Sequence, residues 1–252
     1  KHTDDFGLPE TAEENVAGVA LQALMEAYEK QIGFNVTVHK NIKPGSGLGS
    51  SAAGSAGAVV AANHLLDNHF TNEDLVRFAM NGEKLATGVK HADNVAPCIY
   101  GGITLVRSAF PLDIISLSSP DLYVTVVHPQ IEVKTADARQ ILRKDVKLKD
   151  AIKQWGNIAG LVTGILKNDI PLISRSLEDV IIEPVRSILI PGFGIVKDLS
   201  KEAGALGGGI SGSGPSIFML SENDIIAKQI EQEMIKVYSS MGIEYKTYVT
   251  SI

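Results

Sequence analysis

The sequence predicts an α+β protein of two domains, each of which mixes helices with strands. Apolar residues recur at helical spacing in both halves of the chain, and both halves also contain short segments typical of strands. Residues 117–120, Leu-Ser-Ser-Pro, form a turn-prone segment between the halves, so we expect one domain over residues 1–119 and another over residues 120–252. A chain of 252 residues with 44% hydrophobic residues can bury one large core or two smaller ones.

The first half of the chain predicts three helices and a strand around a glycine-rich loop. Residues 11–29 begin with a capping-box pattern, Thr-Ala-Glu-Glu, and continue with apolar residues at helical spacing. Apolar and polar residues alternate over 34–38, which is typical of a half-buried strand. Residues 51–66 are rich in Ala and Gly and predict a helix that packs closely against a neighbour. Thr71 caps a third helix. Its apolar stripe consists of Leu75, Phe78, Ala79, Gly82 and Ala86.

The second half predicts further helices and strands in mixed order. A strongly apolar strand is expected over 122–127, and the chain is expected to end with strand, helix and strand. These last elements are expected over 217–220, 226–237 and 245–250. The other helices are expected over 136–142, 151–166, 172–181 and 195–203, and a glycine-rich loop over 207–214. Cys98 and Trp155 are expected to fill core or boundary space.

Composition excludes several classes of protein. The net charge is −6, and no cluster of Lys and Arg interleaved with aromatic residues occurs, so we expect no nucleic-acid partner. A single cysteine excludes an internal disulfide framework, and no apolar run is long enough to span a bilayer. These features favour a reducing, cytoplasmic setting and no membrane partner.

The glycine-rich loop over residues 44–53 is the most informative segment for function. Its glycines let backbone N–H groups turn toward an anion, and the helix that follows contributes unpaired donors and the positive end of its dipole. The loop lacks the Gly-Lys-Ser/Thr ending of a Walker A motif, so we expect a phosphate cradle of another type. The alternative is a glycine-rich turn before a closely packed helix.

Glu83 is the carboxylate most clearly placed for a function. It follows Leu75 by eight residues and Ala79 by four, at the edge of the inward-facing stripe of its helix. Burial of an uncompensated charge is costly, so a cation such as Mg²⁺ would explain the carboxylate there. The alternative is a carboxylate at the border with solvent.

Two further groups of polar residues are weaker signals by themselves. Residues 91–97, His-Ala-Asp-Asn-Val-Ala-Pro, place polar and turn-forming residues between a helix and an apolar run. Arg139 and Arg186 could each form a surface ion pair, but Arg186 lies between two apolar segments, which favours anion binding. The glycine-rich residues 207–215 precede a strand and not a helix, which excludes a dinucleotide-binding motif. Two interpretations stay open: the loop supplies backbone donors near a phosphate, or it forms a tight turn that brings two elements together.

Together, these segments resemble the GHMP kinases, small-molecule kinases named for galactose, homoserine, mevalonate and phosphomevalonate. Residues 44–53 match the central phosphate-binding motif of that family, and residues 207–216 match its C-terminal glycine motif. Residues 134–139, residues 183–186 and residues 189–192 match segments typical of the branch that phosphorylates homoserine. The resemblance covers essentially the whole chain. It implies a GHMP kinase fold with a ferredoxin-like C-terminal domain and a nucleotide bound between the two domains.

The resemblance also implies the roles of individual residues. Asn15 and Lys40 would lie near the adenine of ATP, and Ser51 and Glu83 would hold Mg²⁺. The triphosphate would be bound by Pro44, Gly45, Ser46, Gly47, Leu48, Gly49, Ser50 and Ser51. Asn94 would lie beside the attacking hydroxyl group. The substrate would be held by His91, Asn94, Thr135, Arg139 and Arg186, in agreement with the ability of arginine to bind a carboxylate through two parallel hydrogen bonds.

The implied reaction is transfer of the γ-phosphoryl group of ATP to the hydroxyl of L-homoserine, a step of threonine biosynthesis. Asn94, Ser51 and Glu83 would be the catalytic residues. An asparagine cannot accept the proton as a base, so we expect catalysis by positioning and electrostatics. Homodimers are common in the family that the chain resembles, and the sequence does not decide the oligomeric state.

The chain departs from the family pattern at its start. The first motif of the family, Pro-x-Ser-Ser-Ala-Asn-Leu-Gly-x-Gly-Phe-Asp, has no match, so we expect a preceding segment on the order of fifty residues, enough for two or three strands. Two other functions stay open. The first is a kinase for another small alcohol, such as mevalonate or a sugar, and an uncharged sugar would not need the pair of Arg139 and Arg186. The second is a nucleotide-binding regulator without catalysis, which would not need Ser51, Glu83 and Asn94.

Overall fold

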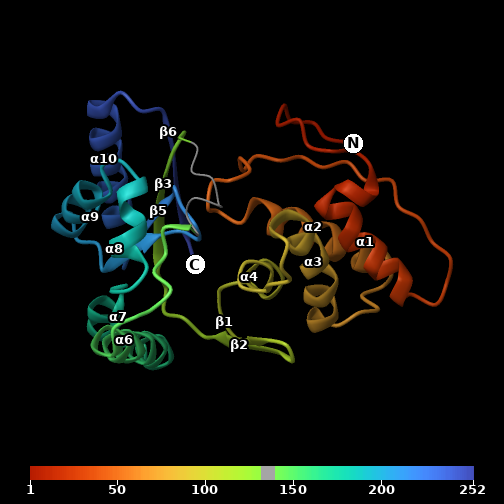
Figure 1. Ribbon diagram of the computed structural model, residues 1–252, viewed down its shortest axis with the longest axis horizontal. Helices are drawn as coiled ribbons and strands as arrows, with labels where there is room; N and C mark the ends of the chain where they lie inside the picture. The colour runs from red at the N-terminus through yellow and green to blue at the C-terminus, as the bar shows by residue number, and fades with distance from the viewer. Residues whose placement is uncertain (132–139) are drawn as a thin grey trace. The chain divides into compact units, whose positions relative to one another are not determined.

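The computed structural model describes residues 1–131 and 140–252, and it divides them into two compact units (Figure 1). The N-terminal unit consists of Lys1–Pro44 and Gly49–Ser116. The C-terminal unit consists of Gly45–Leu48 and Leu117–Ile252. The short segment Gly45–Leu48 of the glycine-rich loop therefore belongs to the C-terminal unit, although the residues on either side of it belong to the N-terminal unit. No helix within the described ranges is both long and apolar enough to cross a membrane.

Helices form the core of the N-terminal unit. The elements in chain order are the 3-10 turn η1 (Ala12–Glu14), α1 (Val16–Ala27), α2 (Ser50–Leu65), α3 (Asn72–Thr87), α4 (Val95–Tyr100), β1 (Ile103–Ala109) and β2 (Leu112–Leu117). The helices α1, α2 and α3 pack against one another. Their core contains many alanines, and at Gly82 of α3 an added Cβ would lie 2.0 Å from Ser55 Oγ of α2. Small residues thus allow the close helix packing that the Ala- and Gly-rich segment predicts.

The helix predicted to begin at residue 11 begins later, at Val16. The Thr11 hydroxyl donates a hydrogen bond to the Glu14 carboxylate at 2.8 Å, but it caps no backbone N–H group. Asn15 is extended, and its side-chain oxygen accepts from the Ala17 N–H at 2.9 Å. Asn15 is therefore the N-cap of α1, and the capping-box pattern produces one 3-10 turn before it.

The predicted strand over residues 34–38 does not form a ladder. Its side chains do alternate between half-buried and exposed positions, and Phe34 and Val36 pack on the helical core. The hydrogen bonds of Val38, however, join only the first residues of the chain: its N–H donates to Lys1 O at 2.8 Å, and its carbonyl accepts from the Thr3 N–H at 3.1 Å. Pairing with so few residues is too short for a ladder. Residues 34–38 therefore form an extended segment that keeps the predicted alternation of half-buried and exposed side chains.

The hairpin of β1 and β2 was not among the predicted elements. Its residues carry partly buried side chains on both faces and lack strict alternation, so the pattern gives a weak strand signal. Of the predicted stripe of α3, Leu75, Ala79 and Gly82 are buried, whereas Ala86 is exposed because it lies in the last turn of the helix. The capping of α3 by Thr71 is confirmed.

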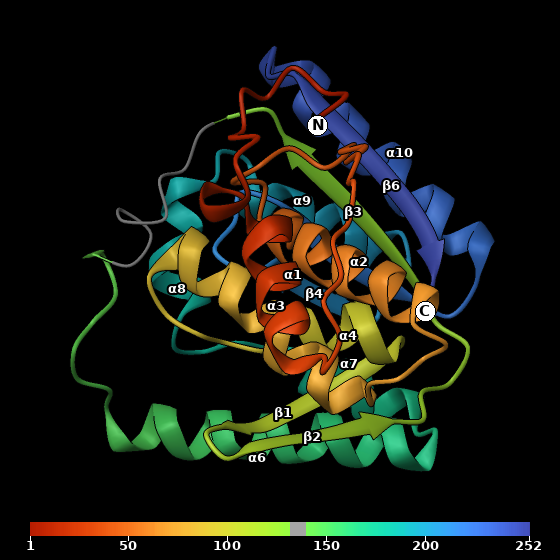
Figure 2. The same ribbon diagram turned by 90° about the vertical axis from the view of Figure 1, so that its right-hand side faces the viewer.

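The C-terminal unit is built on a four-stranded antiparallel sheet of order β4-β5-β3-β6. Its strands are β3 (Tyr123–Pro129), β4 (Gly207–Ile210), β5 (Ile217–Ser221) and β6 (Tyr245–Ser251). The helices α9 (Phe193–Glu202) and α10 (Asp224–Met241) pack on this sheet, and Figure 2 shows α10 running beside β6. The remaining elements are α6 (Leu148–Lys167), α7 (Ile170–Ser176), α8 (Glu183–Arg186) and the 3-10 turn η2 (Ser187–Leu189).

Three predictions in the C-terminal unit are corrected. The helix expected over 172–181 ends at Ser176, because the Asp179 carboxylate accepts hydrogen bonds from three successive N–H groups and organises a turn before α8. The first four residues of the loop expected over 207–214 form β4. Trp155 is exposed, and so is Cys98 in the N-terminal unit, so neither fills a core. Of the helix expected over 136–142, residues 136–139 lie outside the described residues.

Candidate functional site

In the N-terminal unit, Lys40 and Ser50 fix the start of α2. Lys40 Nζ donates hydrogen bonds to Ser50 O at 2.7 Å and to Ser50 Oγ at 3.0 Å, and the Ser50 hydroxyl donates to Ile42 O at 2.7 Å. Gly49 precedes the helix with a φ of 67°, in the left-handed region that favours glycine. The side chain of Ser50 is therefore committed to the protein, whereas the first N–H groups of α2 have no partner within the helix.

Glu83 is the central carboxylate of the N-terminal unit. It lies on α3 with only 2% of its surface exposed, and its Oε1 has no hydrogen-bond partner among the described residues. Its Oε2 lies 3.5 Å from His91 Nε2. Burial raises the pKa of Glu83, and a hydrogen bond to the Ser51 side chain together with the charges of His91 and Lys40 partly oppose that rise. The structure therefore places the Glu83 carboxylate inside the unit and not at the border with solvent.

Burial acts in the opposite direction on the neighbouring cation. It lowers the pKa of Lys40, and the negative charges of Asp4 and Glu83 partly restore it. The buried carboxylate and the half-buried ammonium therefore lie within electrostatic reach of one another, near the first turn of α2. This arrangement concentrates charged groups and unpaired backbone donors in one place, as a polyphosphate site with a cation requires.

His91 and Asn94 complete this cluster. His91 Nδ1 lies 2.6 Å from Asp93 Oδ1, and His91 Nε2 lies 3.2 Å from Thr87 Oγ1, so the ring is held between α3 and the start of α4. Asn94 is the N-cap residue of α4, and its side chain lies beside Gly49: an added Cβ there would be 3.6 Å from Asn94 Oδ1. The structure thus brings Lys40, Ser50, Ser51, Glu83, His91 and Asn94 together around the N-terminus of α2.

Asn15 lies apart from this cluster. Its side-chain nitrogen donates to Pro9 O at 2.6 Å, and it lies 2.7 Å from His2 Nε2. Asn15 lines a cavity of about 480 Å³ with residues of the extended segment 34–38 and of α1, whereas Lys40 does not line that cavity. The two residues that were assigned together to the adenine therefore have different surroundings.

In the C-terminal unit, the two glycine-rich segments are joined to each other. Ser46 O accepts hydrogen bonds from the Ser216 N–H at 3.2 Å and from the Ser216 hydroxyl at 2.7 Å. Gly47 O accepts from the Ser211 hydroxyl at 2.8 Å, and a Cβ added at Gly47 would lie 2.4 Å from Ser211 O. Gly47 is therefore required for close contact between two backbones. The hydroxyls of Ser211 and Ser216 thus bind backbone carbonyls of the first segment, a contact that the separate motifs did not reveal.

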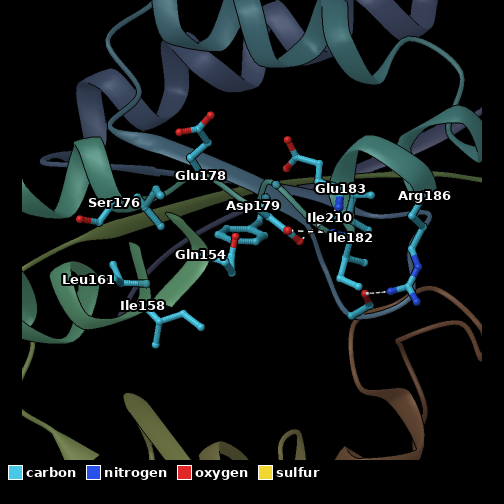
Figure 3. Close-up of a pocket in the computed structure, with 15 residues that line it drawn as sticks. Gln154, Ile158, Leu161, Ser176, Glu178, Asp179, Ile182, Glu183, Arg186 and Ile210 are labelled. Carbon is cyan, nitrogen blue, oxygen red and sulfur yellow. Dashed lines mark hydrogen bonds between the residues drawn. The ribbon is translucent and has the colours of Figure 1, made fainter. Parts of the chain in front are cut away.

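Arg186 lies at one end of a second cavity, of about 230 Å³, between α6, α8 and β4 (Figure 3). Its Nη1 donates to Gly212 O at 3.1 Å, which connects α8 to the second glycine-rich segment. Glu183, one turn before it, forms an ion pair with Lys197 and lies against Gly209, where an added Cβ would be 2.5 Å from Glu183 Oε2. Burial raises the pKa of Glu183, and Lys197 opposes the rise. Thr135 and Arg139, the other predicted substrate ligands, lie outside the described residues.

Sequence reasoning did not find the Glu183–Lys197 pair or the contacts of Ser211 and Ser216. Glu183 and Lys197 are fourteen residues apart, so no helical spacing connects them. The repeated Ser-Gly composition of residues 46–50 and 211–214 was the available signal that the two segments belong together.

Comparison with known proteins identifies the family. The model of the GHMP kinases N terminal domain matches residues 15–102, and the model of the GHMP kinases C terminal domain matches residues 161–240. These two matches correspond to the two motif-bearing halves of the sequence. The chain belongs to the GHMP kinases.

Within that family the relatives are homoserine kinases. The chain is 45% identical over 245 residues to the homoserine kinase of Chloroherpeton thalassium, covering 93% of this chain and 77% of the relative. It is 40% identical to the homoserine kinase of Pyrococcus furiosus, covering 100% of this chain and 87% of the relative. The crystal structure of homoserine kinase from Cytophaga hutchinsonii superimposes with a TM-score of 0.95 at 49% identity, over 99% of this chain and 79% of that one. The homoserine kinase branch is therefore its place among the GHMP kinases, and the resemblance drawn from the motifs is confirmed.

The contact between the two glycine-rich segments predicts a specific effect of Gly47→Ala. Gly45 and Gly47 both have a positive φ, of 76° and 80°, but an added Cβ meets nothing within 4 Å at Gly45. Both substitutions should cost about 1 kcal/mol through backbone strain. Gly47→Ala should cost about 1–3 kcal/mol more, because its methyl group collides with Ser211 O. Urea unfolding of the two variants measures this difference. Equal destabilisation would contradict the requirement for close contact at Gly47.

Proposed function

We propose that this protein transfers the γ-phosphoryl group of ATP to the hydroxyl of L-homoserine, giving O-phospho-L-homoserine and ADP. Membership of the homoserine kinase branch supports the reaction and the substrate class. The observation that carries the proposal in the structure is Glu83: a buried carboxylate with an unpaired oxygen beside the hydroxyl-bearing first turn of a helix.

We also propose that the first domain ends at residue 119 and that the second begins at residue 120.

The donor set fits a magnesium ion. Mg²⁺ prefers hard oxygen ligands, and the Glu83 carboxylate and the Ser51 hydroxyl supply them next to unpaired N–H groups of α2. The orphaned Oε1 of Glu83 favours a bound cation over a purely structural role. In this proposal Ser51 and Glu83 hold Mg²⁺, which supplies positive charge against the phosphate oxygens of ATP.

The remaining residues of the N-terminal unit position the reactants. The backbone N–H groups at the start of α2 and the loop of residues 44–51 bind the triphosphate. Lys40 keeps Ser50 and the first turn of α2 in place, and its ammonium adds positive charge nearby. Asn15 and Lys40 are proposed to lie near the adenine of ATP, and Asn15 lines the cavity beside α1.

The substrate is proposed to bind through its carboxylate and its hydroxyl. Arg186, Arg139, Thr135 and His91 hold homoserine, and Asn94 lies beside the hydroxyl that attacks the phosphorus. Asn94 can donate and accept hydrogen bonds but cannot take a proton as a base. The proton therefore leaves to the transferred phosphate or to water, and alignment of the two oxygens with charge neutralisation lowers the barrier.

Substrate selectivity tests the proposed function directly. ADP release should be measured with magnesium and ATP against homoserine, threonine, serine, mevalonate and galactose. We expect turnover with homoserine well above the others. Galactose has no carboxylate for the arginines, and the hydroxyl lies one carbon closer to the carboxylate in serine and threonine and one carbon farther from it in mevalonate. Comparable release with mevalonate or galactose would contradict the assignment to homoserine.

A matched pair of variants separates substrate binding from nucleotide binding in that assay. Arg186→Lys should raise KM for homoserine by about 10- to 100-fold and leave KM for ATP nearly unchanged, because lysine cannot form two parallel hydrogen bonds to a carboxylate. Arg175→Lys, on the exposed part of α7, should change neither constant.

The burial of Glu83 also predicts how pH affects stability without metal. Because its pKa is raised in the folded state, ionisation of Glu83 costs the fold stability as pH rises above the ordinary range of a glutamate. Glu83→Gln should therefore be more stable than the unsubstituted protein by about 1–3 kcal/mol at pH 8, and the difference should shrink toward pH 4. Urea unfolding in the presence of a chelator measures it.

The control for that measurement is Glu73→Gln, on an exposed position of the same helix. It should show no such gain at pH 8. Addition of Mg²⁺ and ADP should stabilise the unsubstituted protein and Glu73→Gln but not Glu83→Gln. Equal stabilisation of all three would contradict the role of Glu83 as a metal ligand.

A further inference from the structure

The helix α8 carries Arg186 but is too short to hold one conformation by itself. It consists of four residues, Glu183–Arg186, or about one turn. The first turn of a helix costs more conformational entropy than its few hydrogen bonds return, so an isolated helix of this length does not persist in water. The direction in which α8 presents Arg186 therefore depends on contacts that other elements make with the helix.

Asp179 fixes the backbone where the chain enters α8. Its Oδ1 accepts hydrogen bonds from the N–H groups of Ile181 and Ile182, at 2.8 and 2.9 Å. Its Oδ2 accepts from the Glu183 N–H at 3.2 Å. The carboxylate also lies at the positive end of the one-turn helix, where a negative charge is favourable. These bonds determine where α8 begins.

The Glu183 side chain ties α8 to the core of the C-terminal unit. Its Oε1 forms an ion pair with Lys197 Nζ of α9, and the two side chains are only 13% and 14% exposed. The helix α9 is anchored in the core by Phe193 and Val196, and Lys197 Nζ lies 5.6 Å from the centre of the Phe193 ring. Rotation of α8 would separate two charges that are largely withdrawn from water, which is costly.

The second glycine-rich segment contacts α8 at both ends. A Cβ added at Gly209 of β4 would lie 2.5 Å from Glu183 Oε2, so glycine at this position lets the carboxylate lie against the strand. At the other end, Arg186 Nη1 donates to Gly212 O at 3.1 Å. Figure 3 shows the Glu183 and Arg186 side chains leaving α8 in opposite directions. The anchored carboxylate and the guanidinium are therefore connected through the single turn between them.

We propose that the ion pair of Glu183 and Lys197 positions Arg186, so that its guanidinium meets the carboxylate of the phosphoryl acceptor in the correct plane. This inference rests on the proposed function, in which Arg186 binds homoserine. Two parallel hydrogen bonds to a carboxylate require both the place and the plane of the guanidinium to be correct. Both follow from the direction in which α8 starts the side chain. Glu183 and Lys197 are thus positioning residues that act without touching the substrate.

Removal of the anchoring carboxylate should affect one substrate and not the other. Glu183→Met keeps the length of the side chain and should raise KM for homoserine about 10-fold, while KM for ATP and kcat stay within about 2-fold. ADP release measures these constants. The control is Glu233→Met, which removes a carboxylate from a more exposed ion pair with Lys236 on α10 and should change none of them. An unchanged KM for homoserine, or an equal rise of both KM values, overturns the proposal.

The cation of the pair should behave in the same way. Lys197→Met should raise KM for homoserine about as much as Glu183→Met does, because either change breaks the same ion pair. Lys197→Arg retains a cation and should stay within about 2-fold of the unsubstituted protein. A normal KM in Lys197→Met contradicts the role of the pair.

The Arg186→Lys background tests whether Glu183 acts through Arg186. With the guanidinium absent, there is nothing for the ion pair to position, so Glu183→Met should raise KM for homoserine by less than about 2-fold further. An effect of Glu183 that is independent of Arg186 would multiply the two increases. Such a product contradicts the proposal.

A double variant separates positioning from stability. Glu183→Met or Lys197→Met alone leaves a largely buried charge without its partner, so each should lower the urea midpoint of unfolding. The double variant Glu183→Met, Lys197→Met removes both charges and should unfold at a higher midpoint than either single variant. Its KM for homoserine should nevertheless stay raised about 10-fold, because the anchor is still missing. A KM that returns to normal in the double variant overturns the positioning role.

These measurements also distinguish this inference from the function on which it rests. If the unsubstituted protein does not turn over homoserine, the proposed function is contradicted and the inference falls with it. If it turns over homoserine and Glu183→Met does so with the same KM, only the positioning by Glu183 and Lys197 is contradicted.

Discussion

The burial of the Glu83 carboxylate is the constraint on which the candidate site depends. Glu83 is almost completely enclosed on α3, and one of its oxygens has no hydrogen-bond partner among the described residues. A carboxylate in such surroundings is expensive unless a cation or a hydrogen-bond network compensates it. Ser51, His91 and Lys40 compensate it in part, and each reaches it from a different segment. The packing of α2 on α3 thus determines which groups would hold the proposed cation.

The glycines of the central loop serve two different physical purposes. Gly49 adopts a left-handed conformation that begins α2, which leaves the first N–H groups of the helix available for an anion. Gly47 provides space for the backbone of the second glycine-rich segment, which is held by the hydroxyls of Ser211 and Ser216. A single motif therefore combines the proposed anion site with contact between distant parts of the chain.

Periodicity and composition predicted the elements whose own side chains form the core, such as α2, α3, α10 and the strands β3, β5 and β6, but not β4. It also placed Glu83 on the inner side of α3. It could not predict the extended segment 34–38, since a strand is decided by its partner, or the contacts of Ser50 and Glu183, which join residues distant in sequence. Trp155 was misplaced for a related reason: helical spacing shows that a stripe is apolar but not whether the protein's own core covers it.

The most direct test of the account is a crystal structure of the protein with Mn²⁺ in place of Mg²⁺ and a non-hydrolysable ATP analogue, with anomalous scattering recorded from the manganese. The account predicts an anomalous peak within coordination distance, about 2.0–2.3 Å, of both a Glu83 carboxylate oxygen and Ser51 Oγ. A peak bound only to the phosphates, with Glu83 still enclosed and out of reach of the ion, would contradict it.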